Sequence, residues 1–159
     1  MFEEARKYIE EDEQKKKIFM YLYKFLPVVV AAAYLIILFT LWGYQDYRFA
    51  RALEVPLFLV LGVTVLRKVI NAKRPYEEDG FEPMIEKAKE GESFPSRHVA
   101  SATIIAMAAL QVNIATGIML LLISILMGVM RVIAGVHHKE DVIAGFAISV
   151  VVGVMAFFI

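Results

Sequence analysis

The stretch VASATIIAMAALQVNIATGIMLLLISILMGVM, residues Val99–Met130, contains no Asp, Glu, Lys, Arg or His. A second stretch, Val142–Ile159, is also free of these side chains. Uncharged runs of this length are typical of transmembrane helices, each of which needs about 20 apolar residues. The hydrophobic fraction, 59%, exceeds the roughly 45–50% of ordinary soluble domains. The sequence therefore predicts an all-α, membrane-integral helical bundle.

Apolar runs along the rest of the chain predict about five transmembrane helices, approximately over residues 25–43, 52–70, 97–112, 118–134 and 138–159. A polar helix is expected before them, over about residues 1–17, because acid–base pairs spaced four apart, such as Glu3/Lys7, stabilise a helix. We therefore expect a polar N-terminal helical arm over 1–24 and a transmembrane domain over 25–159. A short surface helix is expected over Pro83–Lys89.

The charge and cysteine counts exclude several classes of function. Seventeen basic and seventeen acidic residues give a net charge of zero, so no nucleic-acid partner is expected. The chain has no cysteine, which excludes disulfides and thiolate metal sites. Membrane lipids are the expected surroundings, and the sequence leaves a homo-oligomer open.

Three polar fragments lie at the ends of the apolar runs. They read RKVINAKRP (Arg67–Pro75), PSRH (Pro95–His98) and RVIAGVHHKED (Arg131–Asp141). If the five predicted helices cross the membrane in alternating directions, all three fragments reach the side that also carries the N-terminus. The sequence therefore predicts one composite site at one face of the membrane.

Two of these fragments carry groups suited to holding an anion. Arg67 and Arg74 are seven residues apart, two helical turns, and are expected to share a face at a helix end, where guanidiniums bind phosphate oxygens in bidentate fashion. They could equally be interfacial anchors. Ser96 is expected to cap a helix and to leave the N–H groups of Arg97 and His98 free for an anion. The alternative is a simple cap beside a surface histidine.

The third fragment carries a candidate nucleophile. His137 and Asp141 are four residues apart, so a carboxylate can fix the tautomer of the imidazole. Such a histidine can attack phosphorus, with His98 available for proton transfer and Arg131 closing on the phosphate. The alternative is a surface pair with no catalytic task. All three histidines of the chain, at positions 98, 137 and 138, lie within these fragments, which favours a function.

A metal site is the competing use of the same residues. His137, His138 and Asp141 could supply ligands, but a further ligand is not evident. The three arginines would also repel a cation and suit an anion. We therefore expect neither a metal nor any other cofactor.

Together the fragments resemble the signature of the type 2 phosphatidic acid phosphatase family. That signature runs Lys, six residues, Arg-Pro; then Pro-Ser-Gly-His; then Ser-Arg, five residues, His, three residues, Asp. The matching positions are Arg74, Pro75, Pro95, Ser96, His98, Arg131, His137 and Asp141. Three positions depart from it: Arg67 stands for Lys, Arg97 for Gly and Met130 for Ser.

The resemblance implies a metal-independent membrane phosphatase that acts on a lipid phosphate. In it, His137 forms a phosphohistidine, His98 protonates the leaving oxygen and Asp141 steadies the imidazole. The phosphate is held by Arg67, Arg74, Ser96, Arg97 and Arg131. Candidate substrates are phosphatidate, phosphatidylglycerol phosphate and isoprenyl diphosphate.

Two other functions remain open at this point: a non-catalytic lipid-phosphate-binding membrane protein and a vanadate-dependent haloperoxidase. The expected location is the cell membrane, with several crossings. Basic residues are concentrated on the N-terminal side, which favours a cytoplasmic site. They are Arg6, Lys7, Lys15, Lys16, Lys17 and Lys24.

Overall fold

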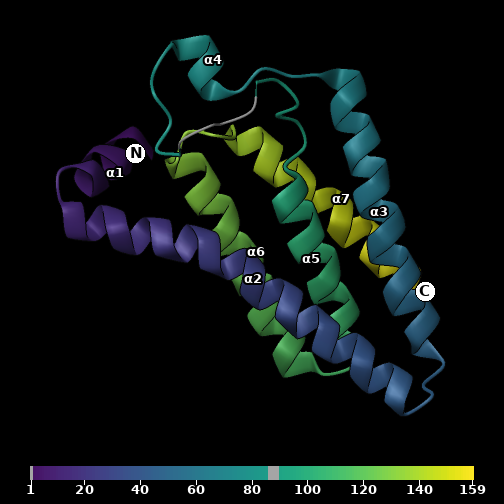
Figure 1. Cartoon of the computed structure of the whole chain (residues 1–159). Coiled ribbons are helices and arrows are strands. Elements are labelled where there is room, and N and C mark those ends of the chain that lie inside the picture. Colours follow the sequence, from purple (N-terminus) through teal and green to yellow (C-terminus); the bar gives the residue numbers. More distant parts are fainter. Residues whose placement is uncertain (1, 86–89) are drawn as a thin grey trace.

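The structure, a computed structural model, describes residues 2–85 and 90–159. Within these residues it contains helices and no strand, which confirms the all-α prediction (Figure 1). The helices are α1 (Phe2–Glu10), α2 (Glu13–Gly43), α3 (Arg48–Ile70), α4 (Pro75–Asp79), α5 (Arg97–Leu110), α6 (Ile114–Ile133) and α7 (Lys139–Phe157).

Four helical segments of the described chain are long and apolar enough to cross a membrane, where about five were expected. Three of them are α2, α6 and α7, and the fourth is the segment Arg48–Asp79, which contains α3. The predicted third span corresponds to α5, which has only 14 residues. At 1.5 Å per residue it is about 21 Å long, shorter than the roughly 30 Å hydrocarbon layer.

The short helix α5 lies at the centre of the bundle. It packs against α2, α3, α6 and α7. Its buried positions are mostly small, which lets the neighbouring helices approach closely. They include Ala100, Ala102, Ala106, Ala108 and Ala109. The central position of α5 places its N-terminal residues among the ends of the surrounding helices.

The N-terminal arm is two helices rather than one. Asp12 interrupts the predicted polar helix because its carboxylate accepts hydrogen bonds from the N–H groups of Gln14 and Lys15 and so caps α2. From Glu13 the helix continues into the membrane span without a break at residue 24. Pro27 therefore lies in the helix interior, where a proline removes a hydrogen bond, and α2 is visibly bent (Figure 1).

One end of the bundle gathers the C-terminal ends of α3 and α6 and the N-terminal ends of α5 and α7, with α4 and the connecting loops above them (Figure 1). Helix α3 stops here because Asn71 adopts a left-handed conformation, with φ +45°. The helix expected over Pro83–Lys89 includes residues 86–89, which lie outside the described residues. Residues 83–85 are not helical.

Candidate active site

His137 and Asp141 form a buried pair at this end of the bundle, as their spacing predicted. His137 Nδ1 lies 3.2 Å from Asp141 Oδ2, and His137 is only 2% exposed. The same carboxylate oxygen accepts the backbone N–H of His138 at 2.9 Å and the hydroxyl of Ser93 at 2.5 Å. With Nδ1 facing the carboxylate, the proton of a neutral imidazole belongs on Nδ1, and Nε2 keeps its lone pair.

The electrostatic surroundings keep the His137 imidazole neutral. The pKa of His137 is lowered to about 4, chiefly by burial. The hydrogen bond to Asp141 opposes this shift, and the positive charges of Arg74 and Arg67 add to it. A neutral, oriented imidazole is the form that can attack an electrophile at neutral pH.

Arg67 is buried in the last turns of α3 and holds the loop before α5. Its Nη1 donates to the carbonyl of Ser93 at 3.2 Å and to that of Pro95 at 2.6 Å. Arg67 is 6% exposed. Its guanidinium therefore braces the segment that carries both Ser93 and Ser96.

Arg74 does not share a helical face with Arg67, contrary to the sequence prediction. Because α3 ends at Ile70, Arg74 lies in the following loop and caps α4. It nevertheless reaches the site: Nε donates to the carbonyl of Gly91 at 3.0 Å and Nη1 to that of Val136 at 3.1 Å. The loop, rather than helical periodicity, brings this guanidinium to the residue beside His137.

Glu77 fastens the same loops together and was not predicted. Its Oε2 accepts the backbone N–H of Arg74 and that of Gly91, each at 2.8 Å. One carboxylate oxygen thus ties the start of α4 to the segment leading to α5. This contact fixes the backbone from which the Arg74 side chain extends.

Ser96 precedes α5 as expected, but its hydroxyl does not cap the helix. Its backbone N–H donates to the carbonyl of Asp141 at 2.9 Å, and its carbonyl accepts from Ala100. The hydroxyl oxygen is buried and has no hydrogen-bond partner among the described residues. A buried hydroxyl without a partner is costly in a folded protein unless a ligand satisfies it.

Gly145 explains how α7 comes so close to Ser96. A Cβ atom at this position would lie 2.7 Å from the Ser96 carbonyl oxygen. Any side chain larger than hydrogen would therefore push α7 away from the start of α5. The close approach keeps Ser96 next to Asp141.

His98 and Arg97 occupy the first turn of α5. His98 is half-buried and lies near enough to Arg131, His137 and other site residues for their charges to act on its ring. Arg97 is exposed, so it lies at the rim of the cluster. The structure thus brings both predicted imidazoles to one end of the bundle.

Arg131 is buried near the end of α6 and contacts Tyr23 of α2. Its Nη1 donates to the Tyr23 hydroxyl, and its guanidinium carbon lies 4.2 Å from the centroid of the Tyr23 ring. Arg131 is 8% exposed. Its other N–H groups make no hydrogen bond within the described part of the chain, while the contact with Tyr23 fixes its orientation.

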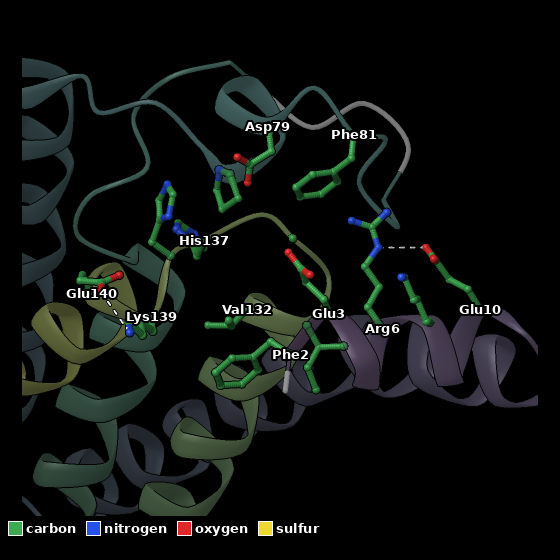
Figure 2. A pocket seen from close by; sticks show the side chains of 15 residues that line it. Phe2, Glu3, Arg6, Glu10, Asp79, Phe81, Val132, His137, Lys139 and Glu140 are labelled. Carbon is green, nitrogen blue, oxygen red and sulfur yellow. Dashed lines mark hydrogen bonds and ion pairs between the residues drawn. The ribbon is translucent and has the colours of Figure 1, made fainter.

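A cavity of about 580 Å³ lies between α1 and the loop that carries His137 (Figure 2). Of the eight predicted site residues, only His137 lines it. Arg6 of α1 stacks 4.4 Å from the centroid of Phe81, whose ring lies against Gly135. Gly135 has φ +73°, a conformation that favours glycine. This stack connects α1 to the His137 loop.

Sequence reasoning missed three residues that contact the predicted ones: Ser93, Glu77 and Tyr23. Ser93 lies only two residues before Pro95, but it matches no position of the recognised motifs. Tyr23 meets Arg131 through tertiary packing, for which the sequence carries no spacing signal. Glu77 lies three residues after Arg74, at the spacing of a capping box, but its contact with Gly91 depends on the path of the loop. Within residues 2–85 and 90–159, no three His, Asp or Glu side chains are grouped to hold a metal ion.

Two solved structures share this fold. The crystal structure of LpxE from Aquifex aeolicus matches with a TM-score of 0.74 and 21% sequence identity, over 96% of this chain and 92% of that one. The crystal structure of the first transmembrane PAP2-type phosphatidylglycerolphosphate phosphatase from Bacillus subtilis matches with a TM-score of 0.67 and 19% identity, over 96% of this chain and 83% of that one. At these identities the likeness shows the fold alone.

A sequence comparison identifies the family. The family model described as the PAP2 superfamily matches residues 48–159, more than half of the chain and the part that carries all eight predicted site residues. The chain therefore belongs to the PAP2 superfamily.

Proposed function

We propose that the protein is a metal-independent membrane phosphatase that removes a phosphate from a lipid through a phosphohistidine intermediate. The observation that carries this proposal is the buried His137, whose Nδ1 faces Asp141 and whose Nε2 makes no hydrogen bond to any residue that the structure describes. The positive charges of Arg67 and Arg74 act on this nucleophile, and the described residues contain no group of three His, Asp or Glu side chains that could hold a metal ion. An anionic, electrophilic phosphate is the substrate that such surroundings favour.

In the first step, His137 Nε2 attacks phosphorus, and the bond from phosphorus to the lipid oxygen breaks. His98, protonated once the phosphate anion lies beside it, gives this proton to the departing oxygen, and Asp141 stabilises the imidazolium that forms at His137. The phosphoryl oxygens are held by Arg67, Arg74, Arg131, the Ser96 hydroxyl and the backbone N–H of Arg97. The Ser96 hydroxyl, which has no partner in residues 2–85 and 90–159, supports this assignment.

In the second step, water attacks the phosphohistidine and His98 takes a proton from it. The nitrogen–phosphorus bond breaks, inorganic phosphate leaves and neutral His137 is restored. Both displacements are expected to be in line, with the entering and leaving groups on opposite sides of phosphorus. The lipid therefore leaves on the side away from His137.

A lipid is the favoured substrate because the site lies at the ends of helices long and apolar enough to cross a membrane. The phosphate of the substrate can then bind at the membrane surface while its hydrocarbon chain stays among the membrane lipids. Phosphatidate, phosphatidylglycerol phosphate and isoprenyl diphosphate all meet this requirement. The exposed Arg97 adds a cation at the rim, which favours a diphosphate.

We also propose that the site faces the cytoplasm. Helix α1 lies at the same end of the bundle as the site (Figure 1). The first 24 residues carry six basic residues, whereas the opposite end carries Arg48 and Arg51 at the start of α3. Protease cleavage of the N-terminal arm should therefore occur in inside-out vesicles and not in intact cells. Cleavage in intact cells would reverse this orientation.

The function is tested by phosphate release from the three candidate lipids in detergent, with and without a metal chelator. Wild type should release phosphate equally in both conditions, and rapid quenching should capture acid-labile phosphate on His137. Lipid binding without phosphate release would indicate a non-catalytic lipid-phosphate-binding protein. Activity that is lost with the chelator and restored by a metal would contradict metal independence.

A further inference from the structure

Tyr23 lies in α2, outside the residues that match the family model, and yet it contacts the arginine cluster. It is half-buried, and its hydroxyl accepts a hydrogen bond from Arg131 Nη1. Its ring also faces the Arg131 guanidinium at 4.2 Å. Arg74 is close enough for its charge to act on the same phenol oxygen. The Tyr23 hydroxyl is therefore close to two of the guanidiniums proposed to bind phosphate.

The Tyr23 hydroxyl accepts a hydrogen bond but donates none to the described residues. A phenol can accept one hydrogen bond and donate another at the same time. Arg131 occupies the accepting side. Within residues 2–85 and 90–159 the Tyr23 O–H has no acceptor. The two nearby charged groups, Arg131 and Arg74, cannot serve as one because a guanidinium can only donate. An anion bound between these cations would supply the missing acceptor.

We propose that Tyr23 is a further phosphate-binding residue, whose O–H donates to a phosphoryl oxygen while its oxygen orients Arg131. This inference rests on the proposed function, since it concerns the same phosphate. It assigns α2 a direct part in the site. The family motifs then describe only part of the phosphate-binding surface, and the N-terminal segment completes it.

The test compares Tyr23→Phe with Tyr34→Phe. The first change removes the hydroxyl and keeps the ring. The second removes another hydroxyl of α2, one that donates to the carbonyl of Ala52 at 3.1 Å, away from the arginines. Tyr23→Phe should weaken inhibition by inorganic phosphate and raise KM, each by about tenfold, the scale of one hydrogen bond to a charged group. Tyr34→Phe should change neither.

An unchanged or stronger phosphate affinity in Tyr23→Phe would overturn the inference. A stronger affinity would mean that Tyr23 competes with phosphate for Arg131 rather than helping to bind it. The binding of inorganic phosphate is measured directly, by calorimetry and by the shift in unfolding temperature. These measurements restrict the comparison to folded protein. This binding measurement does not depend on turnover, so it tests Tyr23 even if the wild type releases no phosphate and the proposed function fails.

A double-mutant cycle with Arg131→Lys tests the orienting role. Lysine keeps the charge but cannot reproduce the guanidinium geometry. Removing the Tyr23 hydroxyl should weaken phosphate binding less in the Arg131→Lys background than in wild type, because the two residues act together. An equal loss in both backgrounds would show that Tyr23 does not act through Arg131 and would overturn that part of the inference.

Discussion

Residues 48–159 and the N-terminal segment before them contribute to the site in different ways. The first region matches the PAP2 family model and holds all eight residues that the motifs predicted. The second lies outside this match, and yet it supplies Tyr23 to Arg131 and the Arg6 stack beside the His137 loop. In the proposed mechanism the motif region carries the reacting groups, whereas the N-terminal segment orients them and adds one phosphate contact through Tyr23. Substitutions in the two regions should therefore differ in how strongly they lower activity.

The largest expected effect belongs to His137→Ala. This change removes the proposed nucleophile, so phosphate release from a lipid substrate should fall to background. His138→Ala is a matched control, because the His138 side chain is partly exposed, its Nε2 lies 3.7 Å from Glu78 Oε2, and it has no part in the proposed reaction. The control should keep most of the activity. Full activity in His137→Ala would exclude the phosphohistidine mechanism.

His98→Ala should slow turnover by about 10²–10⁴-fold, the usual effect of losing one acid–base group. The variant keeps His137, so its first step should be slowed least with a substrate whose leaving group needs no protonation, such as a nitrophenyl phosphate. The ratio of activities on lipid and on nitrophenyl phosphate measures this difference. Equal losses on both substrates would argue against a proton-donating role.

Ser93→Ala should reduce kcat by roughly tenfold, because Asp141 loses one of the hydrogen bonds that hold it against His137. KM should change little, since Ser93 does not belong to the proposed phosphate contacts. Ser124→Ala removes a hydroxyl of α6 that bonds to the Leu121 carbonyl instead, and it should leave kcat unchanged. Steady-state kinetics of the two variants would separate positioning from general loss of stability.

The pH dependence should reflect the buried state of His137. Its pKa of about 4 lies below the ordinary value of 6.5, so the neutral nucleophile persists as the pH falls through the range where an exposed histidine becomes protonated. The contribution of His137 to kcat/KM should be lost only near pH 4. An acidic limb near 6.5 that moves in Asp141→Asn would contradict this assignment.

The smallest effect is expected from Arg6→Ala in the N-terminal segment. This change removes the stack on Phe81, which lies against Gly135, and should lower kcat by about two- to fivefold through looser placement of His137. Lys7→Ala, a neighbouring change on α1, should have no effect on kcat. A loss as large as that of His98→Ala would abolish the proposed distinction between the two regions.

The sequence predicted the helical fold and the His137–Asp141 pair because both depend on local spacing. It also predicted correctly that the three polar fragments lie at one end of the bundle, since this follows from the path of the chain. The shared helical face of Arg67 and Arg74 was wrong, because Asn71 ends α3 before the second arginine is reached. The expected hydroxyl cap at Ser96 was also wrong, since that hydroxyl makes no hydrogen bond among the described residues.

The residues that the sequence did not reveal meet their partners only after folding. Tyr23 and Arg131 are 108 positions apart, and Ser93 and Asp141 are 48 apart. No periodicity links such positions, and neither Tyr23 nor Ser93 has a rare residue type that would single it out. The count of five spans was approximate for a related reason: hydropathy detects an apolar run, but not that the helix within it, α5, has only 14 residues.

The contact between Gly145 and the Ser96 carbonyl has a consequence for comparing and redesigning such proteins. Gly145 offers no functional group, and a search for reactive side chains would pass over it. Replacing it with alanine should nevertheless impair turnover while leaving every chemical group in place. When sequences of homologues are aligned, glycine at this position should mark the chains that keep the two helices this close.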